Sequence, residues 1–170
     1  MHPIIRQIQT RRSIRSYRPD PIAPGLLEDL LQAAMYAPSA RNQQPWHFIV
    51  VNQREALDAL AEANPYAKML YQAPVAILVC AEPKRCTSPQ YWQQDCAAAT
   101  ENILLAAHGV GLGTCWCGLY PAEERCDACR EILNIPADII PLSLIALGYP
   151  AEEKDLPERF QPERIHYNCW

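Results

Sequence analysis

Three arginines and one serine lie within five residues near the start of the chain, in the segment Arg11-Arg12-Ser13-Ile14-Arg15. Like charges this close repel one another unless an anion lies among them or water screens them. An arginine fork matches the oxygens of a phosphate two at a time, and a serine hydroxyl adds a further donor. The cluster therefore indicates a phosphate-binding site, although spacing alone fits a solvated surface equally well.

Amide side chains gather in a second segment, residues 38–46, which reads PSARNQQPW. Amides both donate and accept hydrogen bonds, so they match a planar heterocycle with a mixed polar edge. One amphipathic helix is predicted between this segment and the arginine cluster. Taken alone, the amide segment is typical of an ordinary loop. The two segments together predict a ligand with a phosphate tail and a polar ring.

The order of these residues resembles the N-terminal third of the FMN-dependent nitroreductase family. The shared pattern is R-R-S-x-R-x-Y, a helix, and then P-S-A-x-N-x-Q-P-W-x-F, and a weaker similarity extends over nearly all 170 residues. The matching positions are Arg11, Arg12, Ser13, Arg15, Tyr17, Pro38, Ser39, Ala40, Asn42, Gln44, Pro45, Trp46 and Phe48.

The resemblance implies a division of labour in which bound FMN carries the hydride at N5 while the protein binds and orients it. No catalytic side chain is then expected, and none stands out in the sequence. The phosphate and ribityl chain are expected to contact Arg11, Ser13 and Arg15, with Arg12 assisting. The isoalloxazine ring is expected to contact Pro38, Ser39, Ala40 and Asn42, with Gln44 as a weaker assignment.

Two further assignments follow from the resemblance. The strand that holds Thr114, Cys115 and Trp116 is expected to bring a backbone amide to the flavin N5. Arg159 occupies the place of a second phosphate-binding residue, but the acidic residue before it leaves Arg164 as the alternative.

The predicted function is that of an FMN-dependent oxidoreductase with a ping-pong mechanism. It takes hydride from NADH or NADPH and passes it to an electron-poor acceptor, such as a nitroaromatic, a quinone or an enone. A flavin-binding or flavin-storage protein without turnover is the alternative that shares every binding motif. A phosphate-ligand sensor or structural protein without flavin is a third possibility. The choice between NADH and NADPH stays open.

Composition narrows the class of protein. The net charge of −4 and the pI of about 5.5 argue against a nucleic-acid-binding protein, which usually has a basic face. No stretch approaches the roughly 18 apolar residues of a membrane span, and no secretory signal is recognised. We expect a single cytoplasmic domain over residues 1–170.

Eight cysteines are a high number for this length. They include a C-x-C at Cys115–Cys117 and a C-x-x-C at Cys126–Cys129, separated by only eight residues. The first pair has the wrong spacing for a zinc knuckle, and the second falls in a predicted helix, where both thiols share one face. We therefore expect no metal site and interpret the cysteines as small buried apolar residues.

Periodicity and breakers predict an α+β fold with a mixed or mainly antiparallel sheet of about four to five strands. The glycine-rich segment at 109–114 follows a helix, so it is interpreted as a helix stop and not as a dinucleotide loop. The resemblance implies an intertwined homodimer with FMN at the interface and an exchanged tail at 151–170. The predicted helices are 3–12, 24–36, 53–63, 94–110 and 121–133, and the predicted strands are 46–51, 74–80, 114–119 and 139–147.

Overall fold

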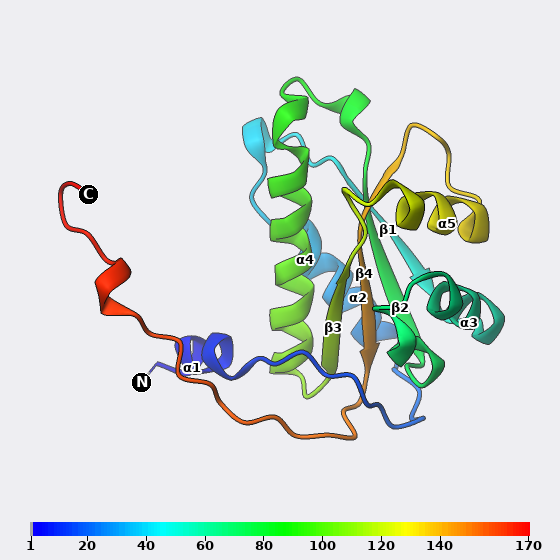
Figure 1. The fold of residues 1–170 in the computed structure, drawn as a ribbon, viewed down its shortest axis with the longest axis horizontal. Coiled ribbons are helices and arrows are strands. Elements are labelled where there is room, and N and C mark those ends of the chain that lie inside the picture. The colour runs from blue at the N-terminus through cyan, green and yellow to red at the C-terminus, as the bar shows by residue number, and fades with distance from the viewer. Residues whose placement is uncertain (1) are drawn as a thin grey trace.

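The computed structural model describes residues 2–170 as an α+β fold built on one antiparallel sheet (Figure 1). The strands lie in the order β1-β2-β4-β3, and every neighbouring pair is antiparallel. The predicted fold class is confirmed, and the sheet has four strands. Their bounds are β1 (Trp46–Val51), β2 (Val75–Ala81), β3 (Gly113–Gly118) and β4 (Ile140–Gly148), within a residue or two of the predicted ranges.

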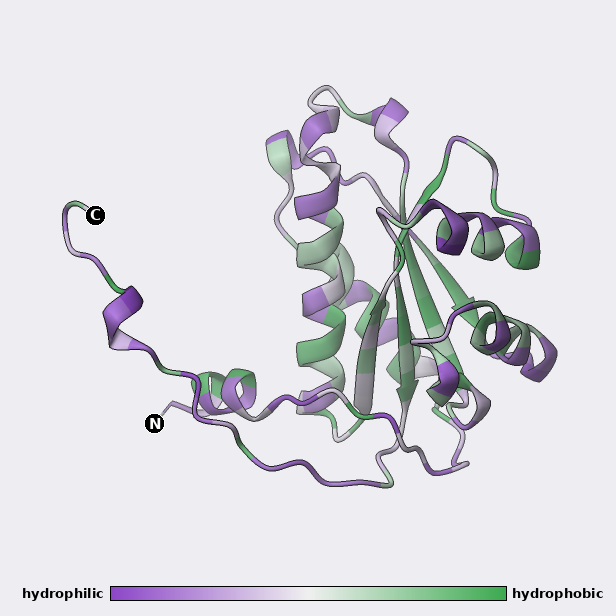
Figure 2. Ribbon diagram, in the orientation of Figure 1, coloured by the Kyte–Doolittle hydropathy of each residue, from purple (hydrophilic) through white to green (hydrophobic). Residues whose placement is uncertain are grey.

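Helices cover both faces of the sheet (Figure 1). Helices α2 and α4 pack on one face, and α3 and α5 pack on the other. The central strand β2 has all seven residues buried, because it is covered on both sides, and this explains its uninterrupted apolar sequence (Figure 2). The helices are α1 (Pro3–Thr10), α2 (Pro24–Met35), α3 (Arg54–Ala63), α4 (Trp92–Gly109) and α5 (Glu123–Leu133).

Helix α4 ends in a glycine stop, as predicted. The Leu112 amide donates to the Ala107 carbonyl over 2.9 Å, and the Gly111 amide donates to the His108 carbonyl over 3.2 Å. These two bonds form a Schellman motif, which requires a left-handed residue, and Gly111 has φ = 81°. The chain then enters β3 at Gly113, where a Cβ atom would lie 2.9 Å from the Ile14 side chain. Gly111 is therefore needed for the end of the helix, and Gly113 for the close approach of Ile14.

Helix α1 differs from its predicted range, which extended to residue 12. It ends at Thr10, and Arg11 already has an extended conformation (φ −57°, ψ 132°). The reason is tertiary, because the following residues pair with the edge of β3. Helix α5 likewise begins at Glu123, since Pro121 lies in the turn before it.

Among residues 2–170, nothing covers two apolar surfaces. The side chains of Ile4, Ile5 and Ile8 on α1 are each at least half exposed. The tail beyond Pro150 runs away from the sheet in an extended form and exposes Phe160 and Trp170 (Figure 1). Among residues 2–170, no helix combines the length and the apolar character needed to cross a membrane.

Candidate functional site

The arginine-rich segment runs along the open edge of the sheet. The Ile14 amide donates to the Thr114 carbonyl over 2.8 Å, and Ser13 forms a parallel bridge with Thr114. Strand β3 is an edge strand, so Thr114 directs its backbone polar groups outward. Residues two and four further on, Trp116 and Gly118, direct theirs to the same side. The structure thus places outward-facing backbone groups directly beyond the arginine cluster, and of these the Gly118 carbonyl accepts from Arg125 over 3.3 Å.

A buried phenol holds this segment in place. The Tyr17 hydroxyl donates to the Ile14 carbonyl over 2.6 Å, and burial raises the pKa of Tyr17 so that the donor stays protonated. On the outer side, a Glu152 oxygen accepts from the Arg15 amide over 2.5 Å. The Lys154 ammonium and the Arg15 amide, as donors, hold the pKa of Glu152 below its usual range. These contacts fix the backbone and leave the Arg15 side chain to face the site.

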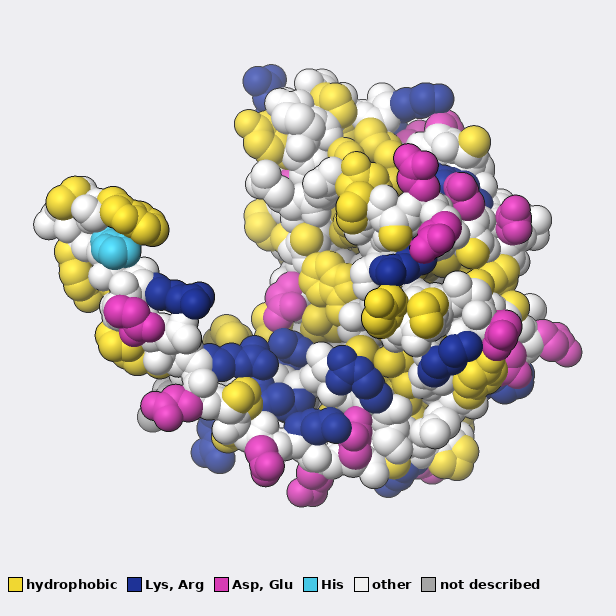
Figure 3. Space-filling model, viewed as in Figure 1, with side chains coloured by type: hydrophobic (Ala, Val, Ile, Leu, Met, Phe, Trp, Pro, Cys, Tyr) yellow, Lys and Arg dark blue, Asp and Glu magenta, His cyan; other side chains and the backbone are white. Residues whose placement is uncertain are grey.

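A cationic cleft lies where the arginine segment meets the start of the tail. Figure 3 shows Lys and Arg side chains gathered there. Partial desolvation and the charges of Arg159 and Arg11 lower the pKa of Arg12, as expected where cations crowd. Arg12 also donates to the Asp155 carbonyl over 3.2 Å, which ties the tail to the cleft. The cleft encloses about 450 Å³ and is lined by Arg12, Ser13, Arg15, Lys154, Asp155, Leu156, Pro157 and Arg159.

The cations of this segment differ in what they contact. Arg11 pairs with Glu101 at 3.5 Å, which directs it toward α4. Within residues 2–170 no ion pair is found for Arg15 or Arg159, so both remain available to an anion in the cleft. Arg164 lies further along the tail and does not line it. The geometry therefore favours Arg159 over Arg164 as the tail's contribution.

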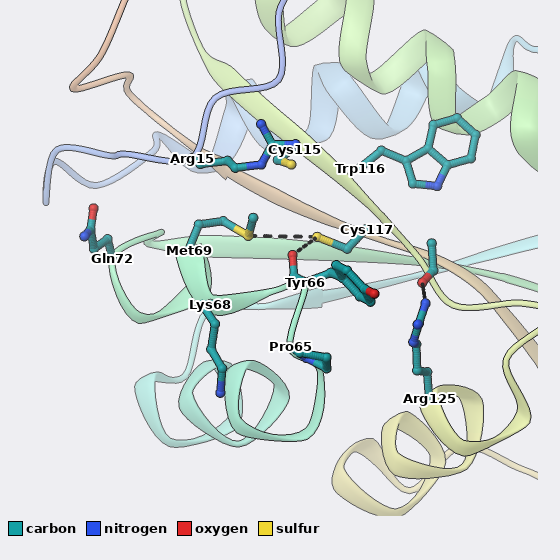
Figure 4. Close-up of a pocket in the computed structure, with 11 residues that line it drawn as sticks. Arg15, Pro65, Tyr66, Lys68, Met69, Gln72, Cys115, Trp116, Cys117 and Arg125 are labelled. Atoms are coloured by element: carbon teal, nitrogen blue, oxygen red, sulfur yellow. Dashed lines mark hydrogen bonds between the residues drawn. The ribbon is translucent and has the colours of Figure 1, made fainter.

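A larger cavity of about 820 Å³ adjoins the cleft, and Arg15 lines both (Figure 4). Its walls come from β3, from α5 and from the 3-10 helix η2 (Lys68–Tyr71). Three of its lining residues are cationic and none is acidic. Sequence reasoning missed the η2 wall, whose only signal was a lysine in a short segment between two apolar stretches. The lining residues are Arg15, Pro65, Tyr66, Lys68, Met69, Gln72, Cys115, Trp116, Cys117, Gly118 and Arg125.

The C-x-C segment forms one wall of this cavity. Cys115 and Cys117 project from one face of β3 and are buried, while Trp116 projects from the other and is 37 % exposed. The neighbouring Cys117 thiol lowers the pKa of Cys115 to about 7 despite burial, and the Arg15 charge adds to this effect. The Cys115 thiol and burial raise the pKa of Cys117, whose own thiol donates to the Tyr66 carbonyl over 3.2 Å. Cys115 is therefore the thiol that ionises first.

The amide segment is not brought to this cavity. The Ala40 amide donates to Asp95 near the start of α4, whereas Gln7 of α1 donates to the Leu105 carbonyl near its end. Ten residues of α-helix separate these two anchors, a distance of about 15 Å along the axis. Within one chain, the structure therefore separates Pro38, Ser39, Ala40, Asn42 and Gln44 from the arginine cluster.

The amide loop is nevertheless rigidly built. One Asp95 oxygen accepts from the Ala40 amide over 2.9 Å, and the other accepts from Gln43 Nε2 over 2.8 Å. Arg41, Asn42 and Gln44 all have positive φ, a conformation that non-glycine residues adopt only when their surroundings hold it. Asp95, only 5 % exposed, provides that hold and was missed by sequence reasoning.

Comparison with known proteins assigns the chain to a family. The chain matches the Nitroreductase family over residues 8–64 and 56–149, and it belongs to that family. It is 52 % identical over 174 residues to a protein of Archaeoglobus fulgidus, covering 100 % of both chains. A crystal structure from Bacteroides thetaiotaomicron has a TM-score of 0.95 at 39 % identity, with 100 % and 99 % of the chains covered. Both carry the name "Putative NADH dehydrogenase/NAD(P)H nitroreductase".

A third relative bears on the ligand. An FMN-dependent nitroreductase from Clostridium difficile has a TM-score of 0.90 and is 30 % identical, with 98 % of this chain and 99 % of that chain covered.

Proposed function

We propose that the protein is an FMN-dependent oxidoreductase that takes hydride from NADH or NADPH. The observation that carries the proposal is that the cationic cleft and the larger cavity meet at Arg15. A cationic cleft suited to a phosphate opens into a longer cavity that runs beside the free edge of β3. The FMN dependence named for the Clostridium difficile relative supports this assignment.

The residues present fit FMN. Ser13, Arg15 and Arg159 would bind the phosphate, and Arg12 would hold the tail against it. The outward amides of Trp116 and Gly118 are donors available to the polar edge of a ring lying along β3. Lys68 and Arg15 line the same cavity and would stabilise negative charge on that ring. Bound FMN supplies the hydride chemistry, so no catalytic side chain is needed.

We further propose that a second copy of the chain completes the site. The amide loop lies too far from the cavity of its own chain, and in the proposed two-fold dimer each loop would lie against the partner's cavity. The exposed faces of α1 and the tail are the surfaces that such a dimer would bury. Each chain contributes one FMN-binding domain over residues 1–170, and the tail at 151–170 embraces the partner.

The proposed reaction is ping-pong. The nicotinamide and the acceptor enter in turn, because both must reach the same ring. Electron-poor acceptors such as nitroaromatics, quinones and enones fit this role, and the nitroreductase names of the relatives support it. In the described chain all eight cysteines are free, which is consistent with the reducing cytoplasm that we propose as its location.

Two-substrate kinetics test the reaction. Initial rates of NADH and of NADPH oxidation are measured at several concentrations of a soluble quinone. Parallel lines in double-reciprocal plots are expected. Intersecting lines would overturn the ping-pong proposal and leave flavin binding intact. A protein that binds FMN but oxidises neither nucleotide would favour the flavin-storage alternative.

A further inference from the structure

Arg125 of α5 lines one end of the larger cavity (Figure 4). Its guanidinium lies over the Tyr66 ring, 4.7 Å from the ring centroid, and Nη1 donates to the Gly118 carbonyl over 3.3 Å. Among residues 2–170, no carboxylate lies within ion-pair distance of this side chain, although Glu123 and Glu124 come directly before it in the chain. The proposed flavin chemistry gives Arg125 no role.

These two contacts fix the orientation of the guanidinium. Stacking on Tyr66 occupies one face of the planar group and leaves its edge, which carries the five N–H donors, open to a ligand. In the described chain, the Gly118 carbonyl is the only acceptor found for these donors. A guanidinium edge matches the two oxygens of a carboxylate. Because the side chain is already ordered, little rotamer freedom is lost when an anion binds.

The other cations of the cavity already have partners or another role. Lys68 pairs with Glu62 at 3.4 Å, and Arg15 also lines the phosphate cleft. Arg125 lies in the first turn of α5, where the partial positive charge of the helix end disfavours a cation. Helix stability therefore does not explain an arginine at this position, whereas binding of an anion in the cavity does.

The place of Arg125 along β3 indicates which anion it binds. The Ile14 amide, next to Arg15, is bonded to Thr114, whereas Arg125 is bonded to Gly118, four residues further along the strand. At about 3.3 Å per residue, the two contacts lie roughly 13 Å apart. Arg125 is therefore at the opposite end of the strand from the phosphate cleft, beyond a ring that would lie along β3.

An anion bound there must be carried close to the reacting part of a substrate. The 2′-phosphate of NADPH is separated from its nicotinamide by two riboses and a pyrophosphate. A carboxylate on an aromatic or conjugated acceptor, by contrast, lies within a few bonds of the group that is reduced. The position of Arg125 therefore favours the acceptor over the nucleotide as the source of the anion.

We propose that Arg125 is a specificity-determining residue that binds a carboxylate on the electron acceptor. The favoured acceptors are then nitroaromatics, quinones or enones that carry a carboxylate near the reducible group. This inference rests on the proposed function, because it assigns a substrate class to the same site. Arg125 binds and orients the acceptor and exchanges neither electrons nor protons with it.

Equilibrium binding tests the inference without turnover. Benzoate and benzamide have nearly the same shape and differ in charge, so their affinities for the FMN-supplied protein, measured by isothermal titration calorimetry, report recognition of the carboxylate. We expect benzoate to bind more tightly. Arg125→Gln should weaken benzoate binding by about 10-fold or more, the equivalent of one hydrogen bond to a charged group, and leave benzamide binding unchanged. Arg125→Lys keeps the charge without the planar fork and should retain part of the benzoate affinity.

Turnover measures the same preference in the reaction. The kcat/KM for 4-nitrobenzoate divided by that for 4-nitrobenzamide should fall by about 10-fold in Arg125→Gln. Arg85→Gln is the matched control, because it removes an arginine whose side chain is 61 % exposed, pairs with Glu82 and lies outside the cavity. The control should keep the ratio of the unchanged protein, and circular dichroism checks that every variant is folded.

The outcomes separate this inference from the function on which it rests. Equal binding of benzoate and benzamide by the unchanged protein, or a benzoate preference that persists in Arg125→Gln, would overturn the inference. A KM that rises for NADPH but not for NADH in Arg125→Gln, with the acceptor preference intact, would overturn it in favour of the 2′-phosphate. Failure to reduce the neutral 4-nitrobenzamide would count against the proposed function, and the binding measurements would still decide the role of Arg125.

Discussion

Replacing Asp95 by asparagine should release the amide loop with almost no change of shape. Gln43 cannot adapt to the new amide, because its side chain is fixed at both ends by Ser88. Gln43 Nε2 donates to the Ser88 carbonyl over 3.1 Å, and the Ser88 amide donates to Gln43 Oε1 over 3.2 Å. The asparagine can still accept from the Ala40 amide, but its NH2 group then faces the Gln43 NH2 group. One charge-assisted bond is replaced by two opposed donors.

The expected loss of stability in Asp95→Asn follows from these contacts. A hydrogen bond to a charged group contributes about 1.5–3 kcal/mol, and a buried donor without a partner costs a further 1–3 kcal/mol. The neutral amide is easier to bury than the carboxylate, which offsets part of the loss. We therefore expect the free energy of unfolding of Asp95→Asn to fall by roughly 2–4 kcal/mol.

Urea denaturation at fixed protein concentration measures this change, and fluorescence titration with FMN measures the loss of affinity that should accompany loosening of the loop. Asp127→Asn is the control, because its carboxylate is exposed, and its stability should change by less than about 0.5 kcal/mol. An Asp95→Asn protein as stable as the control would refute the view that this carboxylate holds the loop.

Four other predictions concern the cleft and the tail. Arg15→Ala should weaken FMN binding roughly 10–150-fold, the equivalent of one hydrogen bond to a charged group, whereas Arg18→Ala, whose side chain pairs with Asp20, should leave it unchanged in the same fluorescence titration. Tyr17→Phe should lower the free energy of unfolding by roughly 1–2 kcal/mol in urea denaturation, because a buried carbonyl loses its donor. Glu152 has a lowered pKa in the folded protein, so its contribution to stability is present above about pH 4.3 and is lost as the pH falls through that folded-state pKa. Glu152→Gln should therefore flatten the acid side of a curve of unfolding free energy against pH. A chain that ends at Arg159 should sediment as a weaker dimer than the full chain in analytical ultracentrifugation, since it lacks the exposed aromatic tail.

Local signals predicted most of the fold. The apolar run of β2 and the leucine stripe of α2 are encoded in a few neighbouring residues, so their bounds could be read to within a residue or two. The end of α1 could not, because the chain leaves the helix at Arg11 and Ser13 then pairs with Thr114 of β3, about a hundred residues away in sequence. The apolar face of α1 was visible in the sequence, but its exposure to solvent was not.

For the candidate site, sequence reasoning named residues but not their arrangement. The arginine cluster and β3 line one cavity, at Arg15 and Cys115. The amide loop lies elsewhere in the chain, because its position is set by Asp95 on a helix that sequence reasoning treated as a packing element. Lys68 and Met69 enter the cavity through a short 3-10 helix that has no periodic signal of its own.

The central claim is that the cleft and the cavity joined at Arg15 bind a flavin that accepts hydride from a nicotinamide. The measurement that tests it most directly is the visible spectrum of the purified protein, supplied with FMN and recorded anaerobically before and after NADH or NADPH. Flavin absorption that bleaches on addition of either nucleotide is the predicted result. A protein that stays colourless after incubation with FMN, or whose flavin bands persist with both nucleotides, would contradict the claim.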